Sequence, residues 1–255
     1  MSRDYEKEID ESNLGEVYKK AFDNRVSKKT FERFEPFFNS NLCLEVGCYD
    51  GSVTNLILSK YKKIIAIDSS STAIKMTEKN LPKGTAVKLK NQSLEAFLEN
   101  PDLGGSMPIF SEPVDVFLMN VIEHLEDASK ILSRLCLKLF FGSRIFIQVP
   151  NVDSLSRQIA ARMGVLETVD IISDFEWNCG HRKNFSFDDL NNLLKRSGFS
   201  ILNSFGVGLK TLSSAQFDKA LRLGLIDEAY IEALFELDHV LPAISGSICF
   251  VAEKR

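Results

Sequence analysis

The chain has 255 residues, of which 44% are hydrophobic, and this suits one α/β domain with elaborations better than two independent domains. Its 31 basic and 35 acidic residues give a net charge of −4. The sequence has no Lys/Arg stripe, so nucleic acid is not expected as a partner. The five cysteines form no C-x-x-C pair, which predicts reduced thiols and no metal site. The amino terminus is charged and the sequence has no apolar run of about 20 residues, so we expect a cytoplasmic protein without a membrane span.

Strand-like and helix-like segments alternate from Leu42 onward, which is typical of βαβ units. Residues 1–41 are expected to form a helical segment beside the site opening, followed by the main domain over residues 42–255. The predicted strands cover residues 42–46, 63–68, 86–90, 114–120 and 143–149, and the predicted helices residues 52–60, 71–80, 94–98 and 128–140. The pattern favours an α/β fold with a doubly wound, mostly parallel, seven-stranded Rossmann-like sheet.

The alternation is interrupted twice after Pro150. Residues 151–185 and 208–241 are expected to be helical lid insertions. A helix over residues 187–197 and a strand over residues 200–205 lie between them. The last strand, residues 247–254, is expected to enter the sheet antiparallel.

The strongest motif is LEVGCYDG, in which an apolar strand ends at Glu45 and a glycine turn leads into a helix. Gly47 and Gly51 allow the turn, but the G-x-G-x-x-G pattern of a diphosphate site is missing. A carboxylate at this strand end favours a ligand with a cationic side, although Glu45 could instead contact nearby amides. Asp68 ends the next strand, where it could bind both hydroxyls of a ribose or cap the helix that follows.

Four segments together resemble the class I S-adenosylmethionine-dependent methyltransferases, the broad group that includes ubiquinone-biosynthesis-type O-methyltransferases. They are LEVGCYDG, IIAIDSS, NQS and VDVFLMNVIEHLED, and in the expected order they cover most of residues 42–150. Tyr49 departs from the motif, because it replaces the middle glycine. It could cover the cofactor or face the acceptor.

The resemblance implies S-adenosylmethionine as cofactor and S-adenosylhomocysteine as product. It places the methionine part at Gly47, the ribose at Asp68, the adenine at Asn91–Ser93, and the sulfonium beside Met119 and Asn120. The full expected cofactor set is Glu45, Gly47, Tyr49, Gly51, Asp68, Ser69, Asn91, Gln92, Ser93, Met119 and Asn120.

Three histidines are candidates for a base that removes the acceptor's proton. The segments VPNVDSLSRQIAARMG, GHRKNFSF and GVGLKTLSSAQF resemble a bacterial subgroup associated with surface-glycan and secondary-metabolite pathways, which makes His181 the first candidate. His181 could instead be an ordering contact of the lid. His124 is the second candidate or a helix cap, and His239 is expected to be structural. The expected acceptor-binding residues are Tyr49, Glu123, Asn151, Arg182 and Lys210. Glu123, beside His124, could instead be a base or a solvated carboxylate.

These features favour O-methylation of a small polar metabolite or glycan precursor, with a phosphorylated acceptor as one option because Arg182, Lys183 and Lys210 flank the proposed mouth. The alternatives are N-methylation of an amino sugar or similar amine, and a non-catalytic module with a methyltransferase-like fold. Methyltransferases that act on a nitrogen of a nucleobase have an NPPY-like tetrapeptide after the fourth strand. This sequence has MNVIEH there instead, which disfavours methylation of a nucleobase. We expect a small-molecule acceptor, and a homodimer is left open.

Overall fold

The apolar runs of the chain form one sheet in the computed structural model, which describes residues 6, 21–99 and 110–255. The strand order is β3-β2-β1-β4-β5-β7-β6, and β1 to β5 run parallel. Strand β7 is antiparallel to both its neighbours and lies inside the sheet, between β5 and β6. The predicted fold class is therefore confirmed. The strands are β1 (Leu42–Val46), β2 (Lys63–Asp68), β3 (Val87–Asn91), β4 (Asp115–Met119), β5 (Arg144–Pro150), β6 (Phe199–Val207) and β7 (Ser247–Lys254).

The direction of winding reverses between β1 and β4. Strands β2 and β3 follow on one side of β1, whereas β4 and β5 lie on its other side. Val46 pairs with both Ile67 of β2 and Leu118 of β4, so these strands end at the same edge of the sheet. Ligands of open α/β sheets bind at such a reversal, beyond the carboxyl ends of the strands.

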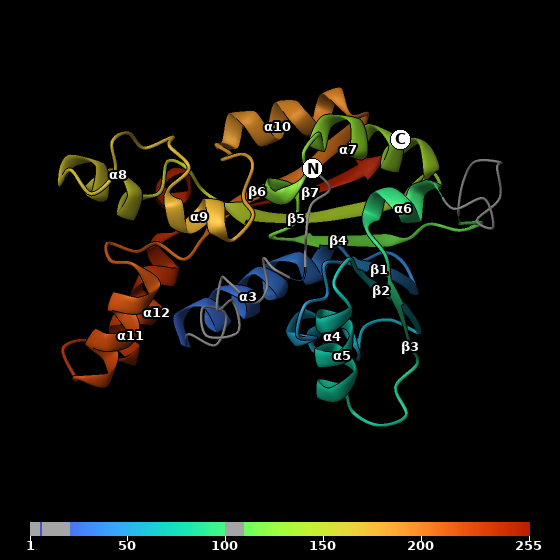
Figure 1. The fold of residues 1–255 in the computed structure, drawn as a ribbon, viewed down its shortest axis with the longest axis horizontal. Coiled ribbons are helices and arrows are strands. Elements are labelled where there is room, and N and C mark those ends of the chain that lie inside the picture. Colours follow the sequence, from blue (N-terminus) through green and yellow to red (C-terminus); the bar gives the residue numbers. More distant parts are fainter. Residues whose placement is uncertain (1–5, 7–20, 100–109) are drawn as a thin grey trace.

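Helices cover both faces of the sheet (Figure 1). Alternate strand residues face opposite sides, so Val116 and Leu118 join one apolar core while Phe117 joins the other. On the second side the Phe117 ring stacks on that of Phe146, with their centroids 4.8 Å apart. One face carries α6 (Leu94–Glu99), α7 (Ala128–Lys138) and α10 (Phe187–Arg196), and the other α3 (Ala21–Phe34), α4 (Ser52–Ile57) and α5 (Ser71–Asn80).

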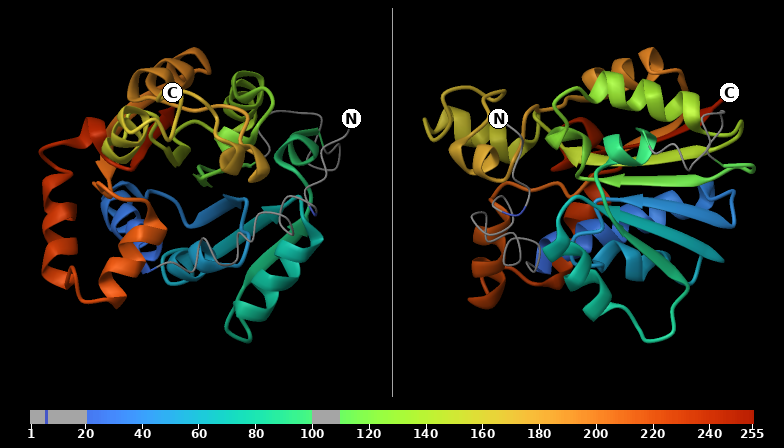
Figure 2. Two further views of the ribbon diagram at one scale, coloured as in Figure 1. Left: turned by 60° about the vertical axis from the view of Figure 1, so that its left-hand side comes forward. Right: turned by 45° about the vertical axis from the view of Figure 1, so that its right-hand side comes forward.

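The helices of the two insertions lie together at one end of the sheet (Figure 2). Phe22 of α3 stacks on Phe217 at 4.9 Å and on Phe235 at 5.6 Å between ring centroids, so the second insertion packs on α3. The first insertion contains α8 (Leu155–Arg162) and α9 (Asp174–Asn178), and the second contains α11 (Ser214–Arg222) and α12 (Glu228–Leu237). The short helices η1 (Glu35–Phe37), η3 (Ile122–His124) and η4 (Pro242–Ile244) complete the described elements.

The amino-terminal segment expected over residues 1–41 is described from α3 onward and at Glu6, while residues 1–5 and 7–20 lie outside the described part. The Glu6 carboxylate accepts hydrogen bonds from the hydroxyl of Ser70 at 2.9 Å and the N–H of Ser71 at 2.5 Å, at the start of α5. A negative charge is favourable at that helix end. Among the described residues, every helix is too short or too polar to cross a membrane.

Candidate active site

A cavity of about 1020 Å³ lies at the carboxyl ends of β1, β2 and β4 and reaches both insertions. Its lining includes Tyr49, Asp68 and Asn120 from the strand ends and Lys210 from the loop after β6. Pockets that hold one drug-sized ligand have volumes of about 300–1,000 Å³. The space is therefore large enough for a donor and an acceptor side by side.

The turn after β1 keeps the backbone shape of a glycine-rich turn. Gly47 and Gly51 have φ angles of 75° and 80°, and Tyr49 also lies in the left-handed region with φ 47°. A side chain at position 47 would bring its Cβ to 2.9 Å from Val121 Cγ2. Left-handed geometry costs a non-glycine residue about 1–2 kcal/mol, and such strain is concentrated at functional sites. The substituted motif position thus retains the conformation that a glycine would adopt.

Asp68 organises the edge of this turn. Its Oδ2 accepts a hydrogen bond from the N–H of Tyr49 at 3.0 Å, and its Oδ1 accepts one from the N–H of Ser70 at 2.9 Å. Burial raises the pKa of this carboxyl above its usual value. A carboxylate offers about four acceptor positions, so the two bonds leave capacity for the two hydroxyls of a ribose. Ser69 lines the same part of the cavity.

The segment after β3 separates into residues inside and outside the cavity. Gln92 and Ser93 line the cavity, whereas the Asn91 amide donates a hydrogen bond to the carbonyl oxygen of Asp68 at 3.0 Å. The Gln92 Nε2 group is buried and has no hydrogen-bond partner among the described residues. A buried donor without a partner is costly, and a nitrogen of an adenine ring would satisfy it. The residues therefore fit the nucleoside part of S-adenosylmethionine.

The end of β4 supplies Met119 and Asn120 to the cavity. Asn120 has φ 55° and accepts a hydrogen bond from Gln148 Nε2 at 3.4 Å. Gln148 also lines the cavity, and its Oε1 atom is buried without a partner among the described residues. The sequence analysis missed Gln148. The available signal was an amide side chain inside the otherwise apolar run IFIQV.

Glu45 lies behind the cavity and outside its lining. Only 1% of the residue is exposed, and its Oε2 accepts a hydrogen bond from the Thr54 hydroxyl at 2.7 Å. Burial raises its pKa to about 7. Gly51 is also outside the lining, at the start of α4. Both residues shape the turn, and their assignment to the cofactor remains a prediction.

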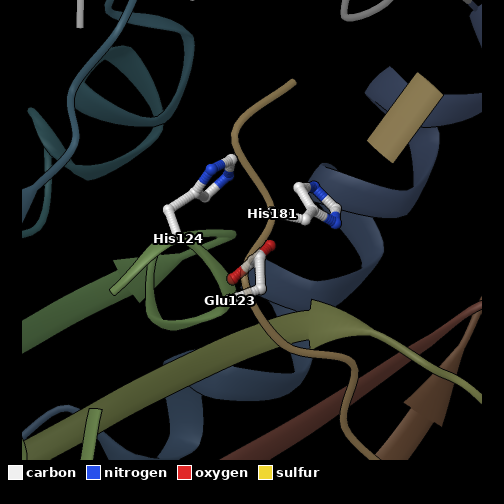
Figure 3. Close-up of side chains that lie close together, drawn as sticks. All are labelled: Glu123, His124 and His181. Carbon is white, nitrogen blue, oxygen red and sulfur yellow. The ribbon is translucent and has the colours of Figure 1, made fainter. Parts of the chain in front are cut away.

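Three side chains with acid–base chemistry lie close together in the lining of the cavity (Figure 3). The rings of His124 and His181 are edge-to-face, with centroids 4.8 Å apart. The carboxyl group of Glu123 points toward the space between them. Glu123 is 1% exposed, and neither carboxyl oxygen has a hydrogen-bond partner among the described residues. Its burial raises the pKa to about 8.

Backbone hydrogen bonds hold this cluster together. The N–H of Arg182 donates to the carbonyl oxygen of Glu123 at 2.8 Å, which joins the first insertion to η3. The N–H of His181 donates to the carbonyl oxygen of Glu176 at 2.9 Å. The first insertion therefore carries His181 to Glu123, although the two residues are far apart in the sequence.

The same three residues are of the types that ligate metals, and their ligand atoms all lie within 4.8 Å of one another. The sequence spacing had not indicated such a group. Two ligand atoms bound to one Zn²⁺ at the usual distance of about 2.0–2.2 Å lie at most about 4.4 Å apart. Ligand atoms separated by the full 4.8 Å would have to move closer together to bind the same ion. The Glu123 carboxyl without a partner can equally accept a proton.

The other expected acceptor residues have contacts within the protein. The Asn151 amide donates to the carbonyl oxygens of Ala243 at 2.9 Å and Ser245 at 2.8 Å, and Asn151 lies outside the lining. Arg182 lies outside it too, with its guanidinium 4.9 Å from the Trp177 ring centroid. Lys210 lines the cavity.

The first insertion is held in shape by Arg157 of α8. Its guanidinium donates to the carbonyl oxygens of Val169, at 2.8 Å, and Ile171, and forms an ion pair with Glu176. The Arg157 and Glu176 side chains are each 14% exposed. Glu176 also caps α9 through Ser173, and its carbonyl oxygen holds His181. Arg157 is thus a positioning residue two contacts away from the acid–base cluster.

Replacing Arg157 with methionine should lower kcat by about tenfold with little change in affinity for S-adenosylhomocysteine. The substitution loosens the segment that positions His181 and leaves the nucleoside side intact, and small misplacements of reacting groups cost about that much or more. Arg162→Met, an exposed arginine on the same helix, is the matched control. Unchanged kcat and unchanged proteolysis of residues 163–178 in Arg157→Met would remove this role.

The chain matches the protein family described as "Methyltransferase domain" over residues 18–204. It is similar in structure to an S-adenosylmethionine-dependent methyltransferase from Archaeoglobus fulgidus, with 20% identity, a TM-score of 0.58, and coverage of 91% of this chain and 94% of that one. It is also similar to a Thermotoga maritima methyltransferase described as a possible histamine N-methyltransferase, with 12% identity, a TM-score of 0.63, and coverage of 98% and 99%.

A third similar structure is the N-methyltransferase NodS from Bradyrhizobium japonicum in complex with S-adenosylhomocysteine. It has 12% identity and a TM-score of 0.59, with coverage of 98% of this chain and 97% of that one. No curated protein sequence matches the chain. At these identities, the structural similarity establishes the shared fold.

The family match covers well over half of the chain, so the protein belongs to the methyltransferase domain family. It is an enzyme whose methyl donor is S-adenosylmethionine. The resemblance inferred from LEVGCYDG and the segments after it is confirmed at this level.

Proposed function

We propose that this enzyme methylates a hydroxyl group of a small molecule and that Glu123 accepts the hydroxyl proton. The observation that carries the proposal is the buried Glu123 carboxyl, which has no hydrogen-bond partner among the described residues and lies on the wall of the cavity that contains Asp68. A buried acceptor without a partner is costly to the fold. An acceptor hydroxyl would supply the missing hydrogen bond.

In the proposed arrangement, Asp68 binds the ribose hydroxyls, Gln92 and Ser93 contact the adenine, and Asn120 lies beside the sulfonium. The acceptor oxygen attacks the donor methyl group in line with the departing sulfur. The carbon–sulfur bond breaks as the carbon–oxygen bond forms, and the hydroxyl proton passes to ionised Glu123. The products are a methyl ether and S-adenosylhomocysteine, and the protonated carboxyl later releases its proton to water.

The electrostatics of Glu123 suit this task. Its pKa of about 8 makes it a stronger base than an ordinary carboxylate, and a base is most effective when its pKa is close to the working pH. The positive sulfonium of the bound donor favours the ionised carboxylate. His124 and His181 flank the carboxyl group and position the acceptor oxygen, and His181 is the route by which the proton leaves Glu123.

A second candidate is N-methylation. A buried carboxylate would pair with an ammonium group, and Glu123 could take the proton that an amine must lose before it attacks. Two structurally similar proteins are described as N-methyltransferases, one with histamine as the possible acceptor. The hydroxyl is preferred because the cluster offers three proton-handling groups, and an alcohol or phenol depends on base assistance more than an amine does.

A matched pair of acceptors tests the proposal. The enzyme is incubated with a tritiated methyl donor and either 4-ethylphenol or 4-ethylaniline, which share the 4-ethylphenyl group and differ only in the nucleophile. We expect label in the phenol ether, with and without a chelator. Label in the amine alone would replace the hydroxyl assignment with the second candidate, and loss of transfer with the chelator would replace the proton-acceptor role by metal binding.

A further inference from the structure

The cavity extends past Glu123 to a wall formed by the first insertion. The side chains of this wall come from α8, the loop after it and α9. We use the term apolar wall for Ile159, Ala160, Met163, Val165, Leu166 and Phe175. The apolar wall, Glu123 and Asp68 all line this cavity.

The apolar wall is exposed to an unusual degree. Met163 is 71% exposed, Val165 70% and Phe175 55%, although all three line the cavity. Neither α8 nor α9 contains a buried residue. A helix at a protein surface normally buries an apolar stripe, and exposed apolar groups that gather in one cavity mark a binding surface.

The cations near the apolar wall have contacts inside the protein. Arg157 binds two carbonyl oxygens and Glu176, and Lys210 donates to the Ser214 hydroxyl at 2.9 Å. The Arg182 guanidinium lies over the Trp177 ring and donates to the carbonyl oxygen of His181 at 3.2 Å. These cations are already engaged by groups of the protein, and an apolar group on the wall leaves all of these contacts in place.

We infer that the methyl acceptor is amphipathic, with an alkyl or aromatic body against the apolar wall and its nucleophile at Glu123. The inference rests on the proposed function, because it places the acceptor in the cavity that holds the donor. It changes the expected acceptor from a small polar metabolite to a molecule whose body is apolar. Burial of that body would supply binding energy in proportion to its apolar area.

A homologous series measures this directly. The probes are 4-methyl-, 4-ethyl-, 4-propyl- and 4-butylphenol, titrated into the protein saturated with S-adenosylhomocysteine. Each buried methylene should tighten Kd by about threefold to fourfold. The acceptor end stays constant along the series, so the slope reports burial of the alkyl chain. A Kd that does not change with chain length overturns the inference.

Two sets of variants locate the effect. Phe175→Ala and Val165→Asp should flatten the dependence on chain length and leave S-adenosylhomocysteine binding unchanged. The controls are Leu225→Ala and Val240→Ala, because both side chains are 74% exposed and lie outside the cavity lining. These controls should keep the dependence of Kd on chain length. Equal flattening in the controls would assign the effect to general surface binding and overturn the inference.

The anion 4-hydroxyphenylacetate provides the opposing probe, because its size is close to that of 4-propylphenol. We expect it to bind at least tenfold more weakly than 4-propylphenol, since a carboxylate against the apolar wall loses hydration. Tighter binding of the anion would favour a charged acceptor. Failure of the proposed function is separately visible, since label would then be missing from every phenol even where affinity rises with chain length.

Discussion

Glu123→Gln is expected to lower kcat by about 10²–10⁴-fold, the usual contribution of a positioned proton acceptor. The amide keeps the size of the side chain and cannot take a proton. Affinity for S-adenosylhomocysteine should stay within about twofold, because Asp68 and Gln92, which we propose to bind the nucleoside, are unchanged. The measurement is a comparison of single-turnover rates at saturating donor. Full activity in the variant would remove Glu123 from proton transfer.

The same substitution should stabilise the fold in alkaline solution. Burial raises the pKa of Glu123 from 4.5 to about 8, so between these values the folded protein holds a proton that the unfolded chain releases. The free energy of unfolding therefore falls as pH rises, by at most about 1.4 kcal/mol for each pH unit in this window. Glutamine removes this loss. The Tm of the variant should exceed that of the wild type at pH 9 and match it at pH 4.5.

Glu126→Gln is the control for both effects, because Glu126 is exposed and lies three residues further along the chain. It removes the same charge without changing the buried site. We expect wild-type kcat and a Tm difference that does not depend on pH. A pH-dependent gain in Tm in this control as well would assign the stabilisation to net charge.

Asp68→Asn is expected to weaken S-adenosylhomocysteine binding by about 10²-fold, and Asp68→Ala by more. Each hydrogen bond to a charged group contributes about 1.5–3 kcal/mol, and a ribose would donate two to this carboxylate. The N–H groups of Tyr49 and Ser70 bind different oxygens of Asp68, so asparagine can accept only one of these two hydrogen bonds, whereas alanine accepts neither. Comparing the Tm of the two variants with that of the wild type measures the loss of the turn contacts separately from the loss of ligand affinity. Isothermal titration calorimetry measures the change.

Glu78→Gln is the matched control on the nearby helix α5, where Glu78 is exposed. Its affinity for S-adenosylhomocysteine should equal that of the wild type. If Asp68→Asn binds as tightly as this control, the carboxylate is only a support for the turn, and the ribose must lie elsewhere.

The half of the cavity that we propose binds the nucleoside could be located from the sequence, because its residues follow short, regular strands. Asp68 ends an apolar run, and the LEVGCYDG turn lies directly before a helix, so both positions depend on local pattern. One boundary in this half was nevertheless predicted one residue too early. The third strand continues to Asn91, one residue beyond its predicted end, and Asn91 bonds to the neighbouring strand while Gln92 reaches the cavity. Successive strand residues face opposite ways.

The acceptor half depended on tertiary contacts that no local period encodes. Glu123 was expected to bind substrate and His181 to be the base, but their convergence follows from the path of an insertion with little regular structure. The contacts of Arg157 with two loop carbonyls and Glu176 decide that path. Lys210 reaches the cavity as expected, while Arg182 turns toward Trp177, because a surface cation takes whichever nearby partner the folded loop offers.

A crystal structure of the enzyme with S-adenosylhomocysteine is the most direct test of the proposed site. We expect the ribose hydroxyls within hydrogen-bond distance of the Asp68 carboxylate, the adenine beside Gln92, and the sulfur facing the side of the cavity where Glu123 lies. The region between the sulfur and the apolar wall would then be free for the acceptor. A nucleoside bound against the apolar wall, with Asp68 and Gln92 out of contact, would contradict this assignment of the donor and acceptor halves.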